Sequence, residues 1–206
     1  MTIEQSLTAY LLAATLLTLT PGADTAIVLR AVTAEGAKPA IGASLGVALG
    51  LLVWGVLVAL GLAGLLAASA VAYTALRWIG AAYLFVMGVK LLLKPRDGLD
   101  APHAQEGNAR ASFTKGLVTN LLNPKVGVFY VTFLPQFVPK GVAVASWIFL
   151  LAAIHAVLVV LWFAILIAAS VPLGRLLRRP SVVRTLDRVM GGLFIAFGAR
   201  LALSRS

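Results

Sequence analysis

The sequence predicts an all-α integral membrane protein, with six transmembrane helices arranged as two inverted repeats of three helices each. The first observation is composition: 61% of the 206 residues are hydrophobic and 12% are charged. A soluble domain is nearer half apolar and a quarter charged. The mean hydropathy is +0.99. A soluble core could not bury this much apolar surface, so lipid is expected to cover the remainder.

The second observation is a series of long apolar runs. A helix needs about 20 mostly apolar residues to cross the hydrocarbon of a bilayer. Six runs meet that length, at 5–29, 39–67, 70–93, 113–135, 142–172 and 183–203. The first run lacks the basic start of a signal peptide and is long enough to span, so we expect it to belong to the folded protein.

One clearly polar stretch divides the chain. Residues 94–112 contain prolines, glycines and acidic residues, a composition typical of a flexible linker. We therefore predict a first three-helix repeat at 1–93, a cytoplasmic linker at 94–112 and a second three-helix repeat at 113–206. A short apolar turn at 68–73 separates the second span from the third.

The basic residues predict the orientation. Twelve lysines and arginines lie on the connections after spans one, three and five, and four lie on the opposite side. Because basic residues are retained in the cytoplasm, both termini are expected to be periplasmic. The same distribution explains the net charge of +10 without a basic patch, so no nucleic-acid partner is expected.

The third observation is internal similarity. Residues 79–91 resemble residues 189–201 at an offset of 110, with Gly88/Gly198, Lys90/Arg200 and Leu91/Leu201 in common. Two further pairs have similar offsets, 103 for Pro21/Pro124 and 108 for Trp54/Trp162. A duplicated unit of three spans must cross the membrane in opposite directions in its two copies, which gives an inverted repeat. The alternative is chance similarity between glycine- and leucine-rich helices.

Two spans contain helix-breaking residues at matching places. The segment 20–24 reads Thr-Pro-Gly-Ala-Asp, and the segment 120–125 reads Asn-Leu-Leu-Asn-Pro-Lys. Proline removes a backbone donor and glycine loosens the chain, so breaks are expected at Pro21 and Pro124. Paired interruptions in two halves indicate a transport site. The alternative is that both prolines only kink their helices.

The breaks carry the charges expected inside the membrane, Asp24 and Lys125. Three interpretations are open: a structural ion pair, an Asp24 that lies near the interface and is solvated, or a site in which Asp24 binds a substrate ammonium or exchanges a proton while Lys125 receives the carboxylate. Under the third, the substrate-binding residues are Thr20, Gly22, Asp24, Asn120, Asn123 and Lys125. His155 is either a proton-coupling partner of Asp24 or a packing histidine.

Gly42, Gly46 and Gly50 form a ladder on one face of span two, which predicts close helix packing within the bundle or in a homodimer. The chain has no cysteine. It also lacks a GxxxxGK[ST] phosphate loop, an HExxH motif, a GxSxG motif and paired carboxylates, so we expect no enzymatic activity, no metal site and no cofactor.

These motifs, together with 80–84 and the run 113–137, resemble the lysine exporter/homoserine–threonine resistance (LysE) family of translocators. The resemblance covers essentially the whole chain and implies efflux of amino acids across a bacterial inner membrane, driven by the proton gradient. Relatives usually have Pro-Gly-Pro in span one, whereas Ala23 replaces the second proline here. Substrate preference is therefore not inferred from the family.

The predicted function is secondary active export of neutral or basic amino acids by proton-coupled alternating access. The partners expected are a small zwitterionic substrate, protons and membrane lipid. Two alternatives remain open at this point: a metal-cation exporter or passive channel of the same superfamily, and a membrane subunit that transports nothing.

Overall fold

The computed structural model describes residues 1–68, 70–95, 108–169 and 179–203, and within them every regular element is a helix. The predicted all-α class is confirmed for this part of the chain. In chain order the elements are α1 (Ile3–Leu19), α2 (Ala23–Ala34), α3 (Ala37–Ala68), α4 (Ala70–Leu93), α5 (Ala109–Leu121), α6 (Pro124–Phe133), the 3-10 helix η1 (Leu134–Phe137), α7 (Val144–Ala168) and α9 (Pro180–Leu203).

Two helices, α3 and α7, are by themselves long and apolar enough to cross a bilayer. Two further pairs qualify if each is taken as one bent span: α1 and α2 meet at 51°, and α5 meets α6 with its continuation at 52°. Among the described residues the count of candidate spans is therefore two, or up to four. The prediction of six spans stays a prediction.

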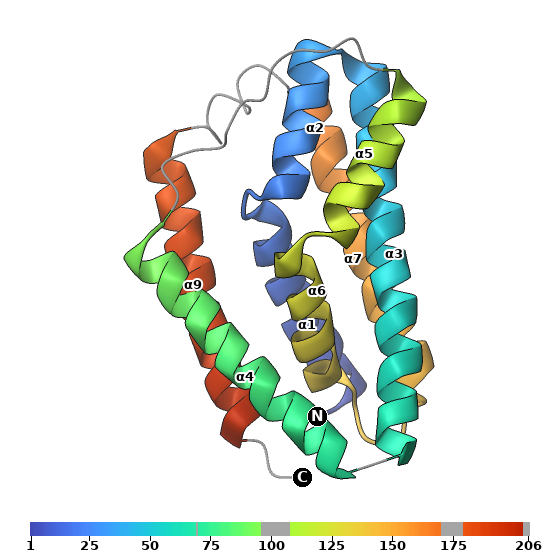
Figure 1. Cartoon of the computed structure of the whole chain (residues 1–206), viewed down its shortest axis with the longest axis vertical. Coiled ribbons are helices and arrows are strands. Elements are labelled where there is room, and N and C mark those ends of the chain that lie inside the picture. Colours follow the sequence, from blue (N-terminus) through green and yellow to red (C-terminus); the bar gives the residue numbers. More distant parts are fainter. Residues whose placement is uncertain (69, 96–107, 170–178, 204–206) are drawn as a thin grey trace.

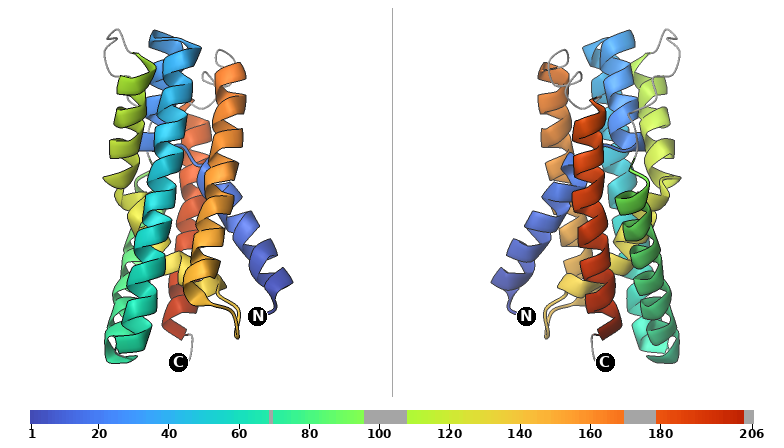
Figure 2. Two further views of the ribbon diagram at one scale, coloured as in Figure 1. Left: turned by 90° about the vertical axis from the view of Figure 1, so that its right-hand side faces the viewer. Right: turned by 90° about the vertical axis from the view of Figure 1, so that its left-hand side faces the viewer.

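The helices form a bundle with an outer pair. Figure 1 shows α2, α3, α5 and α7 together at one end, whereas α1 and α6 continue α2 and α5 towards the other end. Helices α4 and α9 pack side by side along one flank. Figure 2 shows that α1 leans away from the other helices towards its N-terminal end. The start of α1 and the end of α9 lie at the same end of the bundle.

Glycine decides how closely α3 and α5 approach. A Cβ atom added at Gly46 would lie 2.0 Å from the carbonyl oxygen of Phe113, and one added at Gly42 would lie 2.2 Å from that of Ala109. The contact is reciprocal, because a Cβ at Gly116 would lie 2.2 Å from the carbonyl oxygen of Ala43. Backbone therefore packs on backbone, as small faces allow in membrane helices. This contact sets the position of the C-terminal end of α5, where the chain breaks.

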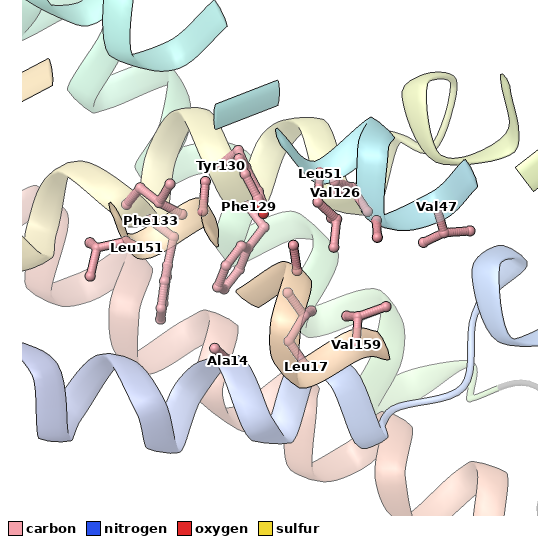
Figure 3. Close-up of a cluster of buried hydrophobic side chains, with 14 of the residues drawn as sticks. Ala14, Leu17, Val47, Leu51, Val126, Phe129, Tyr130, Phe133, Leu151 and Val159 are labelled. Carbon is pink, nitrogen blue, oxygen red and sulfur yellow. The ribbon is translucent and has the colours of Figure 1, made fainter. Parts of the chain in front are cut away.

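The core lies where α1, α3, α6 and α7 meet. Figure 3 shows Leu17, Leu51, Val126 and Val159 turned towards one another from these four helices. An aromatic layer continues the core, with the rings of Phe129 and Phe133 stacked at 4.3 Å between centroids. These side chains hold the two broken segments against α3 and α7.

Several boundaries differ from those predicted. Helix α2 continues to Ala34, past the predicted end at 29, and stops where Gly36 adopts a φ of +94°. Helix α5 begins four residues before the predicted 113, because the side chain of Asn108 accepts a hydrogen bond from the Ala111 amide and caps it. Helix α7 ends at Ala168, and residues 170–172 of the predicted span lie outside the described residues, whereas α9 begins at Pro180 rather than 183. The predicted linker falls mainly on 96–107, outside the described residues.

Candidate functional site

The first broken segment ends α1 at Leu19 and begins α2 at Ala23. Pro21 and Gly22 occupy the gap, and Gly22 is the N-cap of α2 in an extended conformation. Asp24 lies in the first turn of α2. A carboxylate is stabilised there, because the N-terminus of a helix carries partial positive charge.

The second broken segment ends α5 at Leu121 and begins α6 at Pro124. Asn123 is the N-cap of α6, and its Oδ1 accepts a hydrogen bond from the Lys125 amide at 3.1 Å. The carbonyl oxygen of Asn120 accepts from the backbone amide of Asn123 at 3.1 Å and from the indole Nε1 of Trp54 at 3.4 Å. Proline is favoured at the first position of a helix because it has no N–H to leave unpaired. The break is thus satisfied locally.

The two breaks meet at the carboxylate of Asp24. Its Oδ2 accepts a hydrogen bond from Nδ2 of Asn120 at 2.8 Å, and its Oδ1 accepts from Nδ2 of Asn123 at 3.3 Å. Both asparagines are buried, at 0% and 8% exposed, while Asp24 is half-buried. Hydrogen bonds to an ionised group are stronger than those between neutral groups. Two donors from the second half of the chain therefore stabilise a negative charge from the first half.

Asn120 fits because α3 has a glycine beside it. A Cβ atom added at Gly50 would lie 2.5 Å from Oδ1 of Asn120 and 2.9 Å from its Cβ. That Oδ1 atom has no hydrogen-bond partner within the described part of the chain. The amide is thus oriented with its donor on Asp24 and its acceptor against Gly50.

Lys125 contacts the other break. Its Nζ donates a hydrogen bond to the carbonyl oxygen of Thr20 at 3.1 Å. Thr20 follows the last residue of α1, and a cation is favoured at the C-terminal end of a helix. Each charged side chain of the site is consequently placed at the helix end of opposite polarity: Asp24 at the start of α2 and Lys125 at the end of α1.

A small cavity lies between the breaks, and we call it the polar cavity for its charged and amide side chains, although most of its exposed lining is apolar. Its volume is about 40 Å³, and Thr20, Gly22, Asp24, Asn123 and Lys125 all line it. The remaining lining comes from α1, α2, α3, α6 and α7, at Leu17, Thr18, Thr25, Leu51, Val126, His155, Val159 and Phe163. A buried water needs about 10–15 Å³ of cavity volume, so the cavity has room for a few waters.

His155 borders this cavity from α7. It is buried, and its Nδ1 lies 3.0 Å from the hydroxyl of Tyr130. Tyr130 is also fully buried. One ring nitrogen of the histidine thus has a hydrogen-bond partner, and the ring borders the polar cavity. This arrangement fits both a proton-coupling and a packing histidine.

The six residues predicted for substrate binding lie close together in the structure. Five of them line the polar cavity, and Asn120 contacts Asp24: the five are Thr20, Gly22, Asp24, Asn123 and Lys125. The structure places the ladder of Gly42, Gly46 and Gly50 against α5, so that face is occupied inside the bundle. The roles of Thr18, Thr25 and Val159 in lining the cavity carried no sequence signal. Gly50 is singled out by the structure as the neighbour of Asn120.

A second acidic side chain is buried within a helix: Asp187 lies two turns into α9 and is fully buried. Among the described residues, no three histidine or acidic side chains are grouped to hold a metal ion.

Comparison with known proteins identifies the family of this chain. The model of the LysE type translocator family matches residues 15–205. The uncharacterized membrane protein YrhP of Bacillus subtilis is 32% identical, over 97% of this chain and 99% of its own length. The leucine efflux protein of Klebsiella pneumoniae is 33% identical, over 96% of this chain and 94% of its own length.

The homoserine/homoserine lactone efflux protein of Salmonella typhimurium is 30% identical, over 96% of both chains. No solved structure matches the chain. The family match spans nearly the whole sequence and includes both broken segments, and it confirms the resemblance noted from the motifs. The chain therefore belongs to the LysE type translocator family.

Proposed function

We propose that this protein exports amino acids across the bacterial inner membrane, exchanging them for protons by alternating access. Its relatives include proteins named for efflux of leucine and of homoserine. The observation that carries the proposal is the meeting of two helix breaks, one from each half of the chain, at Asp24 and Lys125. An anion and a cation beside one cavity suit the two ends of a zwitterion.

The proposal includes six spans in two inverted repeats. Helices α4 and α9 have 24 residues each, and at 1.5 Å per residue each is about 36 Å long, more than the roughly 30 Å of hydrocarbon. The two bent pairs with α3 and α7 supply the other four spans. Within both halves a bent pair is followed by a long apolar helix and then by a member of the outer pair.

Contacts between α4 and α9 support the repeat. At the offset of 110, Gly88 corresponds to Gly198 (88 + 110) and Ala81 to Gly191 (81 + 110). A Cβ at Gly88 would lie 2.6 Å from the carbonyl oxygen of Gly191, and a Cβ at Gly198 would lie 3.0 Å from that of Ala81. A twofold axis that exchanges the two helices would turn the first contact into the second.

The orientation follows from the basic residues. Arg30 lies in the second half of α2, Lys38 and Arg110 lie at the starts of α3 and α5, and Lys115 lies at the middle of α5. The end of α2 and the starts of α3 and α5 lie at the opposite end of the bundle from the start of α1 (Figure 1). If the basic end is cytoplasmic, both termini are periplasmic.

In the mechanism we propose, Asp24 binds the substrate ammonium and Lys125 contacts its carboxylate. Asn120 and Asn123 hold the Asp24 carboxylate, while Thr20 and Gly22 form the wall of the cavity. When substrate leaves to the outside, Asp24 takes up a proton, and His155 exchanges it with the waters of the cavity. Coupling results because substrate ammonium and proton compete for one carboxylate.

The size of the cavity supports a second conformation. At about 40 Å³ it holds a few waters, whereas even glycine has five non-hydrogen atoms. The segments around the breaks must separate to admit substrate. Such a movement of one half against the other is the alternating access expected of inverted repeats.

A flux assay tests this function. The purified protein in liposomes loaded with radiolabelled leucine, alanine, threonine or lysine is expected to release at least one of them faster when the external medium is acidified. Saturable counterflow at equal pH would separate a carrier from a passive pore. Release that ignores both the pH gradient and competing substrate would contradict the proposal.

A further inference from the structure

A second, wider cavity lies on the other side of Asn123 and is open to the outside of the bundle, since its lining residues Ile79 and Leu122 are 67% and 77% exposed. It has a volume of about 310 Å³ and is bounded by α3, α4, α5 and α6. Its walls are almost entirely apolar and include Trp54, Ile79, Tyr83, Leu121, Val128 and Val131. Figure 1 shows α6, which forms one wall, between α4 and α3. The cavity is several times larger than the polar one.

The two cavities share equivalent positions on the two broken segments. Pro21 and Pro124 differ by 103, and the same offset relates four residues of the polar cavity to four of the apolar one. These pairs are Thr18/Leu121, Thr20/Asn123, Asp24/Gly127 and Thr25/Val128. The first member of each pair lines the polar cavity and the second lines the apolar cavity. Such agreement at one offset is expected if both cavities arise from the same helix break.

The equivalent positions differ in chemistry. Two threonines and the carboxylate of the first half are replaced by leucine, valine and glycine in the second. The glycine has a visible effect, since a Cβ at Gly127 would lie 2.8 Å from the ring of Trp54. Without that Cβ, the indole can lie against α6 and form an apolar wall. The first break is thus lined by charged and polar side chains, and the second break by apolar side chains.

Asn123 joins the two. It lines both cavities, and its amide contacts the carboxylate of Asp24. A ligand that lies across Asn123 would therefore present one end to Asp24 and the other to the apolar walls. Binding sites commonly combine a few polar groups that orient the ligand with a larger apolar surface.

We propose that the apolar cavity binds the side chain of the transported amino acid, so that the preferred substrates carry a large apolar side chain. This inference rests on the proposed function of amino-acid export. The charged backbone of the substrate occupies the polar cavity once the breaks separate, and the side chain passes Asn123 into the apolar cavity. Each buried methylene then improves binding by about fourfold.

Competition in counterflow tests the inference. Leucine has three more side-chain carbons than alanine, and the wild-type protein is expected to prefer leucine by about tenfold or more. Val131→Phe fills the apolar cavity and is expected to remove most of that preference while the inhibition constant of alanine stays within about twofold. The matched control is Val157→Phe, which makes the same change on the exposed face of α7, where the residue is 58% exposed.

A second variant guards against misfolding. Val131→Ala enlarges the cavity without overpacking it, and we expect phenylalanine to gain on leucine as a competitor. Equal competition by leucine and alanine in the wild type, or a preference that neither variant changes, would overturn the inference and leave export intact. If the leucine preference persists after a photoactivatable phospholipid has been cross-linked into the cavity at Val131, the cavity belongs to a lipid chain instead. If neither amino acid exchanges through the wild type or Val157→Phe, the proposed function fails as well.

Discussion

Asp24→Asn is expected to abolish export driven by a pH gradient and to weaken substrate binding by about 30-fold or more, because the substrate ammonium loses its hydrogen-bonded charge partner. The asparagine cannot carry the charge that attracts an ammonium or exchange a proton near neutral pH. It also presents a donor where Asn120 and Asn123 both donate to the wild-type carboxylate. Flux and counterflow in proteoliposomes measure both effects.

The control for this variant is Glu4→Gln, which removes an exposed carboxylate from the first turn of α1. It is expected to transport like the wild type. Removal of a half-buried charge should not unfold the protein, so a melting temperature in detergent similar to that of the wild type is expected for Asp24→Asn. Gradient-driven export that persists in Asp24→Asn would contradict the role given to this carboxylate.

Gly50→Ala is expected to lower substrate affinity by about 10-fold or more, because it displaces a hydrogen bond to a charged group worth about 1.5–3 kcal/mol. The added Cβ would lie 2.5 Å from Oδ1 of Asn120, so the amide must move away from Asp24. If Gly50 acts through the Asn120 amide, the loss of affinity should be much smaller when Asn120 is already alanine, because only its Cβ, 2.9 Å from the added Cβ, then remains in contact. A double-mutant cycle on substrate affinity measures this dependence.

Gly46→Ala is the comparison, because its Cβ would meet the backbone of Phe113 instead of a side chain of the site. Overpacking by this Cβ should lower the free energy of unfolding by about 1–3 kcal/mol, seen as a lower melting temperature. The same decrease should occur in the Asn120→Ala background. An effect of Gly50→Ala that is equally large with and without Asn120 would show that the glycine matters only for helix packing.

The sequence identified those parts of the fold that have a strong local cause. Proline and glycine interrupt helices by backbone chemistry, so the positions of both interruptions could be expected from Pro21 and Pro124. The end of α2 could not, because nothing in its apolar composition stops a helix before Glu35 and Gly36. The start of α5 was missed because Arg110 and Ser112 lower the hydropathy of a segment that Asn108 caps as helix.

The sequence predicted which residues meet at the two breaks but not how they contact one another. Charged and amide side chains within apolar runs are rare and therefore conspicuous. Which donor meets which acceptor depends on tertiary packing: the acceptor for Lys125 is a backbone carbonyl, that of Thr20, which has no signature in sequence. The apolar cavity was also unforeseen, because Leu121 and Val128 differ in no local respect from residues that face lipid.

The most direct test of the central claim, that substrate binds between the two breaks, is protection of a cysteine in the polar cavity. The chain has no cysteine, so Thr18→Cys, at a half-buried position in the cavity lining, supplies a single reactive thiol. Thr114→Cys, on the exposed face of α5, is the control. We predict that a saturating transported amino acid slows alkylation of the thiol at 18 by about tenfold and leaves that at 114 unchanged. Equal alkylation of the thiol at 18 with and without substrate would contradict the site.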